Sequence, residues 1–327
     1  MRLPAVIAKR LVYALVLLFA VLVLNFTLIH LAPGDVAETI AGEAGGASPE
    51  MLAQIRKDYG LDLPFLEQLY RYIEKVVQGD FGYSFYFDRP VTSVIFENVW
   101  PTLLLVVSSL LIAILFGTFL GVFAARRPNG LLSQAITVLA LLGYALPVFW
   151  TGIMLVILFA SFIPLFPTSG MDAGPLGASG FGYVWEVLHH LTLPVVTLST
   201  IYLAFYSRLS RASMMDVLGA DYIRTARAKG LGERVVVFKH ALRNAVLPVV
   251  TFAGLQFGAL FSGAVLVEAV FSWPGLGTLA FDSILRRDTP TLLGILFFSA
   301  LIVIVANLLT DLAYRLVDPR IKSAARA

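Results

Sequence analysis

The sequence contains no cysteine among its 327 residues, which excludes a disulfide framework, a thiolate metal site and a cysteine nucleophile. Charged residues are also scarce: Asp, Glu, Lys and Arg make up 14% of the chain, about half the share found in soluble domains. Apolar residues make up 58%, and the mean hydropathy is +0.84. These values exclude a soluble globule, a disordered chain and a basic nucleic-acid-binding domain, although the net charge is +3.

Six apolar stretches are nearly free of charge and are long enough to cross a bilayer, which takes about 20 helical residues. The longest uncharged run is assigned a single span, because prolines and glycines typical of a loop gather at its far end. The sequence therefore predicts an all-α, polytopic membrane fold with six transmembrane helices. The predicted spans cover residues 11–31, 98–125, 133–163, 187–207, 244–267 and 289–310.

Charges are distributed unequally between the two sets of segments that flank these spans. One set carries 17 of the 24 Lys and Arg residues, whereas the other set carries 16 of the 21 acidic residues. Because basic residues are retained in the cytoplasm during insertion, both termini are predicted to be cytoplasmic. Within one transmembrane domain over 1–327, residues 32–97 then form an extracytoplasmic insertion and residues 208–243 a cytoplasmic loop.

The outer insertion contains two amphipathic helical patterns. The first begins at Pro49 after a capping serine and ends at Gly60, and the second covers an apolar stripe from Phe65 to Val76 before Gly79. These patterns indicate a small helical cap on the outer face. An ordered loop without a function of its own explains them equally well.

The cytoplasmic loop contains a short helical pattern, in which Asp221 is expected to cap a helix from Tyr222 to Lys229 and Gly230 to end it. A helix of this length is unstable alone and requires a docking surface. A second helix is expected to begin near Glu233 and to continue into the fifth span. The apolar side of the short helix is Tyr222, Ile223 and Ala226, and Arg224, Arg227 and Lys229 surround it.

Asp, Glu, Lys and Arg are absent from the central part of every predicted span, where ion-coupled transporters usually place ionisable groups. The sequence also lacks a phosphate-binding loop of the form Gly-x-x-x-x-Gly-Lys-Ser/Thr. Uphill transport by this chain would therefore draw its free energy from another chain. The short cytoplasmic helix is the expected attachment point of such a motor.

Small and polar residues inside the spans have two interpretations each. The small-residue stripes allow close helix packing, which is either static or shifts during transport. The polar residues line a transport path or satisfy the backbones of neighbouring helices. The stripes are Gly117 and Gly121, and Gly254, Gly258 and Ser262; the polar residues are Asn25, Thr197, Ser199, Thr200 and Gln256.

Three other classes of function remain as alternatives. A stand-alone secondary transporter is disfavoured by the absence of mid-membrane charge. An intramembrane protease is suggested by Gly177-Ala178-Ser179-Gly180, but this motif lies in an outer loop and no later span supplies a histidine base. A purely structural scaffold leaves the short cytoplasmic helix unexplained.

Several motifs follow one another in order along the whole chain. On these motifs the chain resembles the inner-membrane permease subunit of bacterial ABC importers for peptides and nickel, of the dipeptide/oligopeptide permease B type. The motifs are Ala32-Pro33-Gly34-Asp35, Tyr59-Gly60-Leu61-Asp62-Leu63-Pro64, Gly79-Asp80-Phe81-Gly82-Tyr83-Ser84, Pro101-Thr102-Leu103, Tyr222-Ile223-Arg224-Thr225-Ala226-Arg227-Ala228-Lys229-Gly230-Leu231, His240-Ala241-Leu242-Arg243-Asn244, Leu247-Pro248, Phe271-Ser272-Trp273-Pro274-Gly275-Leu276-Gly277, Arg287-Asp288-Thr289-Pro290 and Asp318-Pro319-Arg320.

The resemblance implies a type I ABC importer transmembrane domain in the bacterial inner membrane. It implies a heterodimer with a C-type permease subunit, two ATPase subunits and an extracytoplasmic substrate-binding protein. The chain would form half of the path for di- or oligopeptides or a similar solute; similar permeases handle glutathione and nickel chelates. It implies no catalytic residue, metal or cofactor in this chain, with ATP and Mg bound by the partner ATPase subunits.

The resemblance also assigns the short cytoplasmic helix as the family's coupling helix, which docks in a groove of the ATPase. The broader ABC importer signature has Glu-Ala-Ala before the glycine, where this chain has Thr225-Ala226-Arg227, as is usual in the peptide branch. The implied coupling helix comprises Asp221, Tyr222, Ile223, Arg224, Thr225, Ala226, Arg227, Ala228, Lys229 and Gly230.

Overall fold

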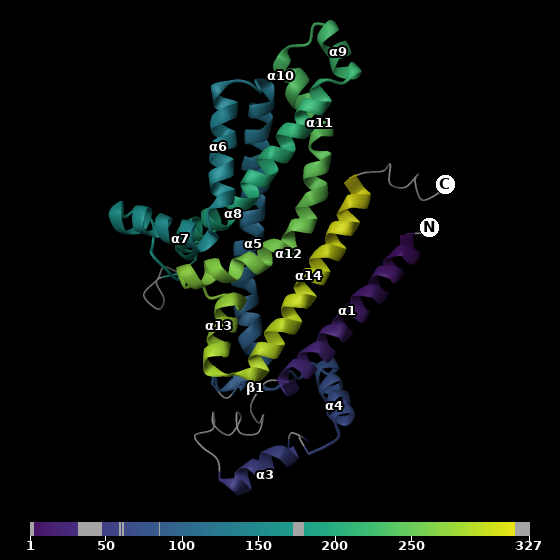
Figure 1. The fold of residues 1–327 in the computed structure, drawn as a ribbon, viewed down its shortest axis with the longest axis vertical. Helices are drawn as coiled ribbons and strands as arrows, with labels where there is room; N and C mark the ends of the chain where they lie inside the picture. Colours follow the sequence, from purple (N-terminus) through teal and green to yellow (C-terminus); the bar gives the residue numbers. More distant parts are fainter. Residues whose placement is uncertain are drawn as a thin grey trace. The chain divides into compact units, whose positions relative to one another are not determined.

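The computed structural model describes residues 3–31, 48–58, 60, 62–84, 86–172 and 180–317, and it divides into two compact units. The first unit comprises Met1–Trp100 and Gly275–Val305, and the second comprises Pro101–Pro274 and Ala306–Ala327. Two helices, α5 (Val91–Arg126) and α14 (Thr289–Val317), cross the boundary along the chain (Figure 1).

The remaining elements belong to one unit each. The first unit contains α1 (Leu3–Leu31), α3 (Pro49–Asp58), α4 (Phe65–Val77), the strands β1 (Tyr83–Ser84) and β2 (Arg89–Pro90), and α13 (Leu276–Arg286). The second contains α6 (Leu131–Ala145), α7 (Val148–Val156), the π-helical η1 (Ile157–Phe162), α8 (Phe181–Leu218), α9 (Asp221–Ala228), α10 (Glu233–Val235), the π-helical η3 (Val236–Ala241), α11 (Leu242–Ala245) and α12 (Leu247–Phe271).

Long apolar helices dominate the described part of the chain, which confirms the predicted all-α fold. Four helices are long and apolar enough to cross a membrane: residues 8–28 of α1, all of α5 and α8, and residues 289–310 of α14. Three bent helix pairs raise the number of spans to at most seven, a range that includes the predicted six. The described sheet is one antiparallel hairpin that pairs Tyr83 with Pro90.

The third predicted span is wrong as a single straight helix. The helices α6 and α7 meet at Leu146-Pro147 and are bent by 105°. Leu146 is extended, with φ −81° and ψ 137°, a conformation that the ring of the following proline favours over the helical one. Proline also cannot donate the backbone hydrogen bond that would continue α6.

The fourth and fifth spans are longer than predicted. The helix α8 continues to Leu218, about three turns beyond the predicted span end. The helix α12 continues to Phe271, so Glu268 lies in its last turn and not in an outer loop. The predicted helix start near Glu233 is confirmed, since α10 begins there and leads through η3 and α11 to α12.

The two helices predicted in the outer insertion are confirmed. The helix α3 begins at Pro49, and Gly60 and Gly79 adopt left-handed backbone angles of φ +66° and +84° after α3 and α4. The ring of Phe26 in α1 lies 5.2 Å from Phe65 and 5.6 Å from Tyr72 of α4, measured between ring centres. These aromatic contacts attach α4 to the end of α1.

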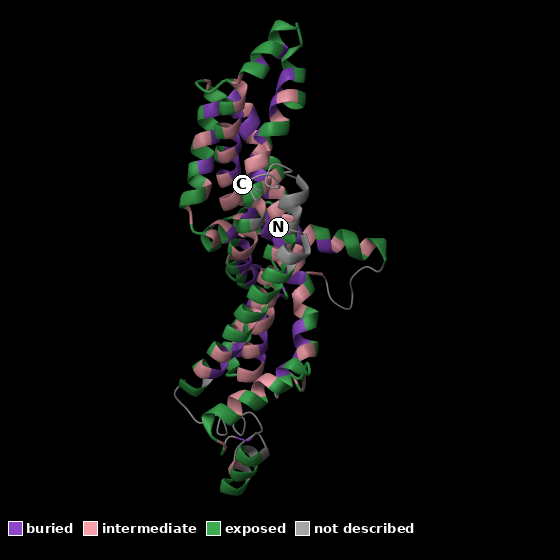
Figure 2. Cartoon of the chain, turned by 90° about the vertical axis from the view of Figure 1, so that its right-hand side faces the viewer, coloured by how far each residue is buried: buried purple, intermediate pink, exposed green. Residues whose placement is uncertain are grey.

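The hairpin and the start of α5 are held to α14 within the first unit. The buried carboxylate of Asp288 accepts a 2.5 Å hydrogen bond from the Ser84 hydroxyl and caps α14 by accepting the Thr291 backbone amide at 3.2 Å. Gly294 allows α5 and α14 to approach, because a Cβ atom there would lie 2.6 Å from Ile95. Figure 2 shows buried and half-buried residues along the helices and mostly exposed residues at the α9 end of the second unit.

Candidate functional site

The candidate site is α9 and the turns at its two ends. The residue that caps α9 is Ala220, which is extended at φ −72° and ψ 149° and makes no side-chain capping bond. The prediction of Asp221 as the cap is therefore wrong. Asp221 is the first helical residue, and its carboxylate lies 3.5 Å from the Arg224 guanidinium. Its negative charge still suits the positive end of the helix dipole.

The end of α9 follows the predicted glycine stop. Gly230 has φ +77°, a conformation that glycine adopts without the Cβ penalty of other residues. Its backbone amide donates to the Arg227 carbonyl at 2.9 Å, and the Leu231 amide donates to the Ala226 carbonyl at 3.4 Å. These two bonds form a Schellman motif, which turns the chain back towards α10.

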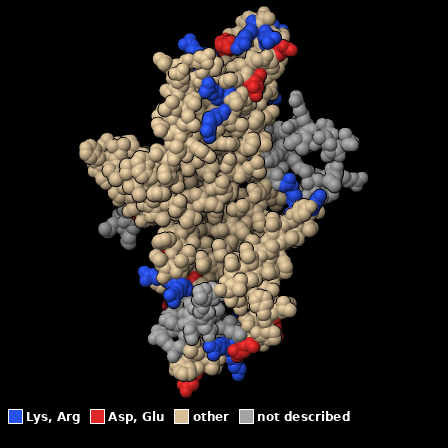
Figure 3. Space-filling view, viewed as in Figure 1, with Lys and Arg blue, Asp and Glu red and all other residues tan. Residues whose placement is uncertain are grey.

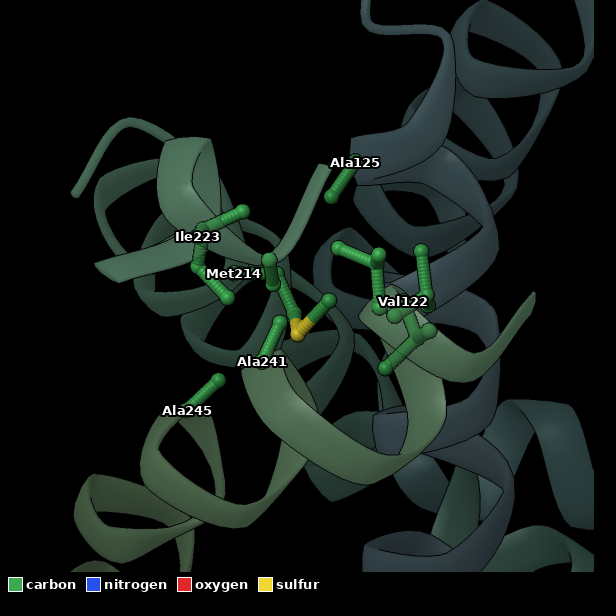
Figure 4. Close-up of a cluster of buried hydrophobic side chains, with 9 residues drawn as sticks. Val122, Ala125, Met214, Ile223, Ala241 and Ala245 are labelled. Carbon is green, nitrogen blue, oxygen red and sulfur yellow. The ribbon is translucent and has the colours of Figure 1, made fainter. Parts of the chain in front are cut away.

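The apolar side of α9 packs inside the chain itself. Ile223 is fully buried and Ala226 is 7% exposed, in a cluster with residues of α5, α8, η3 and α11 (Figure 4). The docking surface that the short helix requires is therefore supplied, for these two side chains, by the chain itself. Short helices gain most of their stability from tertiary packing, and here the chain provides it. The other members of the cluster are Val122, Ala125, Met214, Val236, Val237, Ala241 and Ala245.

Polar contacts hold α9 at both ends. The Asn244 side-chain amide donates a 2.8 Å hydrogen bond to the Tyr222 hydroxyl. The Arg227 guanidinium donates two hydrogen bonds to the Glu233 carboxylate, at 2.9 and 3.2 Å. Hydrogen bonding to Arg227 lowers the pKa of Glu233, helped by the charges of Arg227 and Arg126, and raises the pKa of Arg227. Arg227 is thus paired within the chain and is not free to surround a partner contact.

The outward face of α9 is polar and basic. Arg224, Thr225, Ala228 and Lys229 are all exposed. The Arg224 side chain is 74% exposed, and the pair that it forms with Asp221 stays within α9. In Figure 3, Lys and Arg gather at the end of the second unit that carries α9, whereas the helices below this end show few charges. The face that α9 offers to a partner is therefore polar and positively charged.

Gly117 and Gly121 lie where α5 meets α8. A Cβ atom at Gly117 would lie 2.9 Å from the Leu203 carbonyl oxygen, and one at Gly121 would lie 2.5 Å from the Ser207 carbonyl oxygen. Both glycines therefore permit direct backbone contact. In the second stripe, Gly254 and Gly258 lie within α12, Gly258 is half-buried, and Ser262 is exposed and donates to the Gly258 carbonyl at 3.3 Å.

Three of the five polar span residues bond backbone carbonyls of their own helix. Thr197 and Ser199 are buried, and their hydroxyls donate to the carbonyls of Leu193 and Val196 in the same helix. Thr200 also donates to Val196, and Gln256 is half-buried in α12. Asn25 is 3% exposed, and its amide nitrogen has no hydrogen-bond partner among the described residues.

Sequence reasoning missed a buried polar contact at the end of α12. The fully buried Glu268 accepts a 2.6 Å hydrogen bond from Thr102 of α5. Nearby, the buried Trp273 donates its indole N–H to the Pro101 carbonyl at 2.9 Å. Sequence spacing carries no signal of this contact, because Thr102 and Glu268 lie 166 residues apart along the chain.

Several sequence motifs lie outside the described residues. They include the stretch from Ala32 to Asp35, Tyr59, Leu61, the protease-like Gly177, Ala178 and Ser179, and the stretch from Asp318 to Arg320.

His189 and His190 each bond a backbone carbonyl, at 2.8 Å and 3.0 Å, and their ring centres lie 6.4 Å apart. Across the described residues, no group of three or more His, Asp or Glu side chains is placed to hold a metal ion.

Comparison with known proteins defines the class. Residues 117–323 match the family of binding-protein-dependent transport system inner membrane components, and residues 4–107 match the N-terminal family of such membrane components. The dipeptide transport system permease protein DppB of Escherichia coli K12 is 41% identical over 97% of this chain and 98% of its own length. The glutathione transport system permease protein GsiC of the same strain is 40% identical over 97% and 98%.

A solved structure supports the same fold. The MetNI methionine ABC transporter in an inward-facing conformation matches with a TM-score of 0.55 and 16% identity, over 69% of this chain and 97% of the solved chain. The fold is therefore that of an ABC importer transmembrane domain.

The chain belongs to the family of binding-protein-dependent transport system inner membrane components. It is a multi-pass inner-membrane permease subunit of an ABC importer. It is a transport component, and ATP hydrolysis belongs to separate ATPase subunits. The family also implies a substrate-binding protein that works with the permease.

Proposed function

We propose that α9 is the coupling helix through which the ATPase subunits drive this permease. The observation that carries the proposal is the division of α9 into two sides. Ile223 and Ala226 are buried in a cluster that joins α5, α8, η3 and α11, whereas Arg224, Thr225 and Lys229 face outwards. A force on the outward face is therefore passed directly to the ends of the membrane helices.

Alternating access follows if the two ATPase states bind this face differently. Binding of ATP closes the motor dimer, displaces α9 and opens the path outwards, and hydrolysis reverses the movement. A ligand shifts a conformational equilibrium only by its differential affinity for the two states, so both motor states must contact α9 with different free energy. In this proposal ATP and Mg bind in the ATPase subunits, and this chain holds no cofactor.

The proposal places residues 208–243 in the cytoplasm and the insertion 32–97 outside. The excess of Lys and Arg in the segments on the α9 side supports this orientation, because basic segments stay in the cytoplasm. The outer insertion would then face the binding protein. The small helices α3 and α4 are its ordered parts.

The proposed cargo is a short peptide. The support is the near-full-length similarity to a dipeptide permease and, almost as strong, to a glutathione permease, since glutathione is itself a tripeptide. The second half of the path is proposed to be a C-type permease subunit in a heterodimer. Uptake of labelled dipeptides by the assembled complex, with unlabelled glutathione as competitor, tests the cargo. If the assembled complex does not take up the labelled dipeptides, the proposed peptide cargo is contradicted.

The coupling role is tested by adding bulk to the outward face. Ala228→Trp keeps the buried cluster intact but obstructs the proposed contact, and Ala8→Trp near the start of α1, away from the outer insertion, is the matched control because both alanines are exposed. We expect substrate-stimulated ATP hydrolysis in the assembled complex to fall at least tenfold with Ala228→Trp and to stay unchanged with the control. Unchanged stimulation in Ala228→Trp would overturn the proposal.

A further inference from the structure

The structure suggests how the orientation of α9 is fixed. Only two of its side chains, Ile223 and Ala226, are buried. Such a narrow apolar stripe attaches a helix but leaves it free to roll about its axis, because dispersion contacts between small side chains are not directional. A helix that transmits force needs its rotation fixed as well.

The polar contacts of α9 lie on both sides of this stripe. Successive residues turn by about 100° around a helix. Counted in this way from Tyr222, Ala226 lies at about 40°, Ile223 at about 100° and Arg227 at about 140°. Tyr222 and Arg227 therefore flank the buried stripe on opposite sides and at opposite ends of α9, so together they oppose rolling in either direction.

The partners of these two residues lie on one continuous helical arm. Glu233 is the first residue of α10, and Asn244 lies in α11, directly before the bend of 42° that leads into α12. The arm is tied to α8 as well, because the Ser213 hydroxyl donates to the Ala245 carbonyl at 2.9 Å. Movement of α9 is therefore passed to α12 through the arm and to α8 through its end.

The Arg227–Glu233 contact has the geometry of a directional bond. Two parallel hydrogen bonds between a guanidinium and a carboxylate fix the relative orientation of both groups, which a single ion pair does not. The carboxylate also lies at the N-terminus of α10, where the helix dipole favours a negative charge. Arg126, the last residue of α5, adds a further positive charge near it.

We propose that Glu233 and Asn244 are positioning residues that lock the rotation of α9 through Arg227 and Tyr222. The proposal rests on the coupling role proposed for α9. It adds that coupling depends on two side chains that lie outside α9. Loss of either lock leaves the outward face chemically unchanged but allows α9 to turn under load, so ATP hydrolysis continues while transport per ATP falls.

The first test concerns the lock alone and uses the full chain in lipid nanodiscs without any partner. Amide hydrogen exchange of residues 225–230 is measured for Glu233→Gln, Asn244→Ala and Tyr222→Phe. We expect exchange about three- to tenfold faster than in the unmodified chain. Arg71→Gln, which removes an exposed ion pair of α4 with Glu67 at 3.1 Å, is the matched control and should leave these amides unchanged. Unchanged exchange in all three lock variants would overturn the lock, whatever the role of α9.

The second test uses the assembled complex and measures transport and ATP hydrolysis together. We expect Glu233→Gln to lower the ratio of solute transported to ATP hydrolysed at least threefold, and the exchanged pair Arg227→Glu with Glu233→Arg to restore part of it, because Arg126 and the start of α10 disfavour a cation at position 233. Faster amide exchange with an unchanged ratio would overturn the positioning role. The Tyr222→Phe variant removes a single oxygen atom. If Glu233→Gln or the exchanged pair does not fold, the ratio is measured for Tyr222→Phe instead, and the same outcomes apply.

Discussion

The helices α4 and α9 are both short and amphipathic, and both lie outside the predicted spans, yet they arrange their apolar side chains differently. In α4, Leu66 is 76% exposed and Val77 is 79% exposed, and contact with α1 covers only part of the apolar side. In α9, Ile223 is fully buried. An amphipathic pattern therefore predicts a helix but not which of its faces a partner meets.

The difference shows what each helix is suited to do. The helix α4 is attached to one end of α1, by the aromatic rings of Phe65 and Tyr72 against Phe26 and by a 2.9 Å hydrogen bond between the Gln68 and His30 side chains. The helix α9 is held along its length by a cluster from four other elements and at both ends by polar contacts. The second arrangement fits the coupling role proposed for α9, because a displacement of α9 would move the elements of the cluster with it.

The largest expected effect removes the buried anchor of α9. Ile223→Ala deletes three carbon atoms from a fully buried site, which costs about 2–5 kcal/mol of unfolding free energy. Leu66→Ala in α4 changes an exposed side chain and should alter stability by less than about 0.5 kcal/mol. Unfolding of the purified chain in detergent, followed by circular dichroism, measures both. Equal losses in the two variants would remove the proposed difference between α4 and α9.

A smaller effect is expected at the helix pair on which the α9 cluster rests. Gly121→Ala places a Cβ atom 2.5 Å from the Ser207 carbonyl oxygen, so α5 and α8 must separate at a cost of about 1–3 kcal/mol. At Gly263 the nearest atom would be 3.5 Å away, an ordinary contact, so Gly263→Ala serves as the control. The same unfolding assay applies, and a Gly121→Ala variant as stable as the control would contradict the close approach.

The smallest effect concerns the attachment of α4. Burial raises the pKa of Tyr72 from 10.0 to about 12, because the packed site disfavours the phenolate. The folded state thus prefers the neutral phenol, so its contribution to stability is complete below pH 10 and is lost as pH rises towards 12. In a spectrophotometric titration of tyrosinate, we expect the unmodified chain to show an ionisation near pH 12 that Tyr72→Phe lacks. A lost step near pH 10 would show that Tyr72 is solvated and α4 is loosely attached.

Local sequence signals predicted local structure well. Pro49 and Gly230 set one end each of α3 and α9, because proline and left-handed glycine impose a backbone conformation by themselves. The break at Pro147 was missed, since a proline in a long apolar run is compatible with either a kink or a sharp bend. Burial of Glu268 was missed because its partner Thr102 is distant along the chain.

The candidate site was located by sequence but its orientation was not. Helical spacing identified Ile223 and Ala226 as one side of α9, but spacing carries no information on whether that side meets the same chain or another. The contacts of Glu233 and Asn244 with α9 were not predicted, because both residues lie outside α9 in sequence. Only the fold brings them to its two ends.

The absence of cysteine makes the central claim directly measurable, because each introduced cysteine is the only thiol in the chain. Ala228→Cys lies on the outward face of α9 and Ala53→Cys on α3, and both positions are exposed. The measurement is the rate of maleimide labelling of each thiol in nanodiscs, with and without the ATPase subunits. We predict that the ATPase subunits protect the thiol at position 228 and leave the thiol at position 53 unchanged. Equal labelling of position 228 in both conditions would contradict the claim that the motor acts on this face of α9.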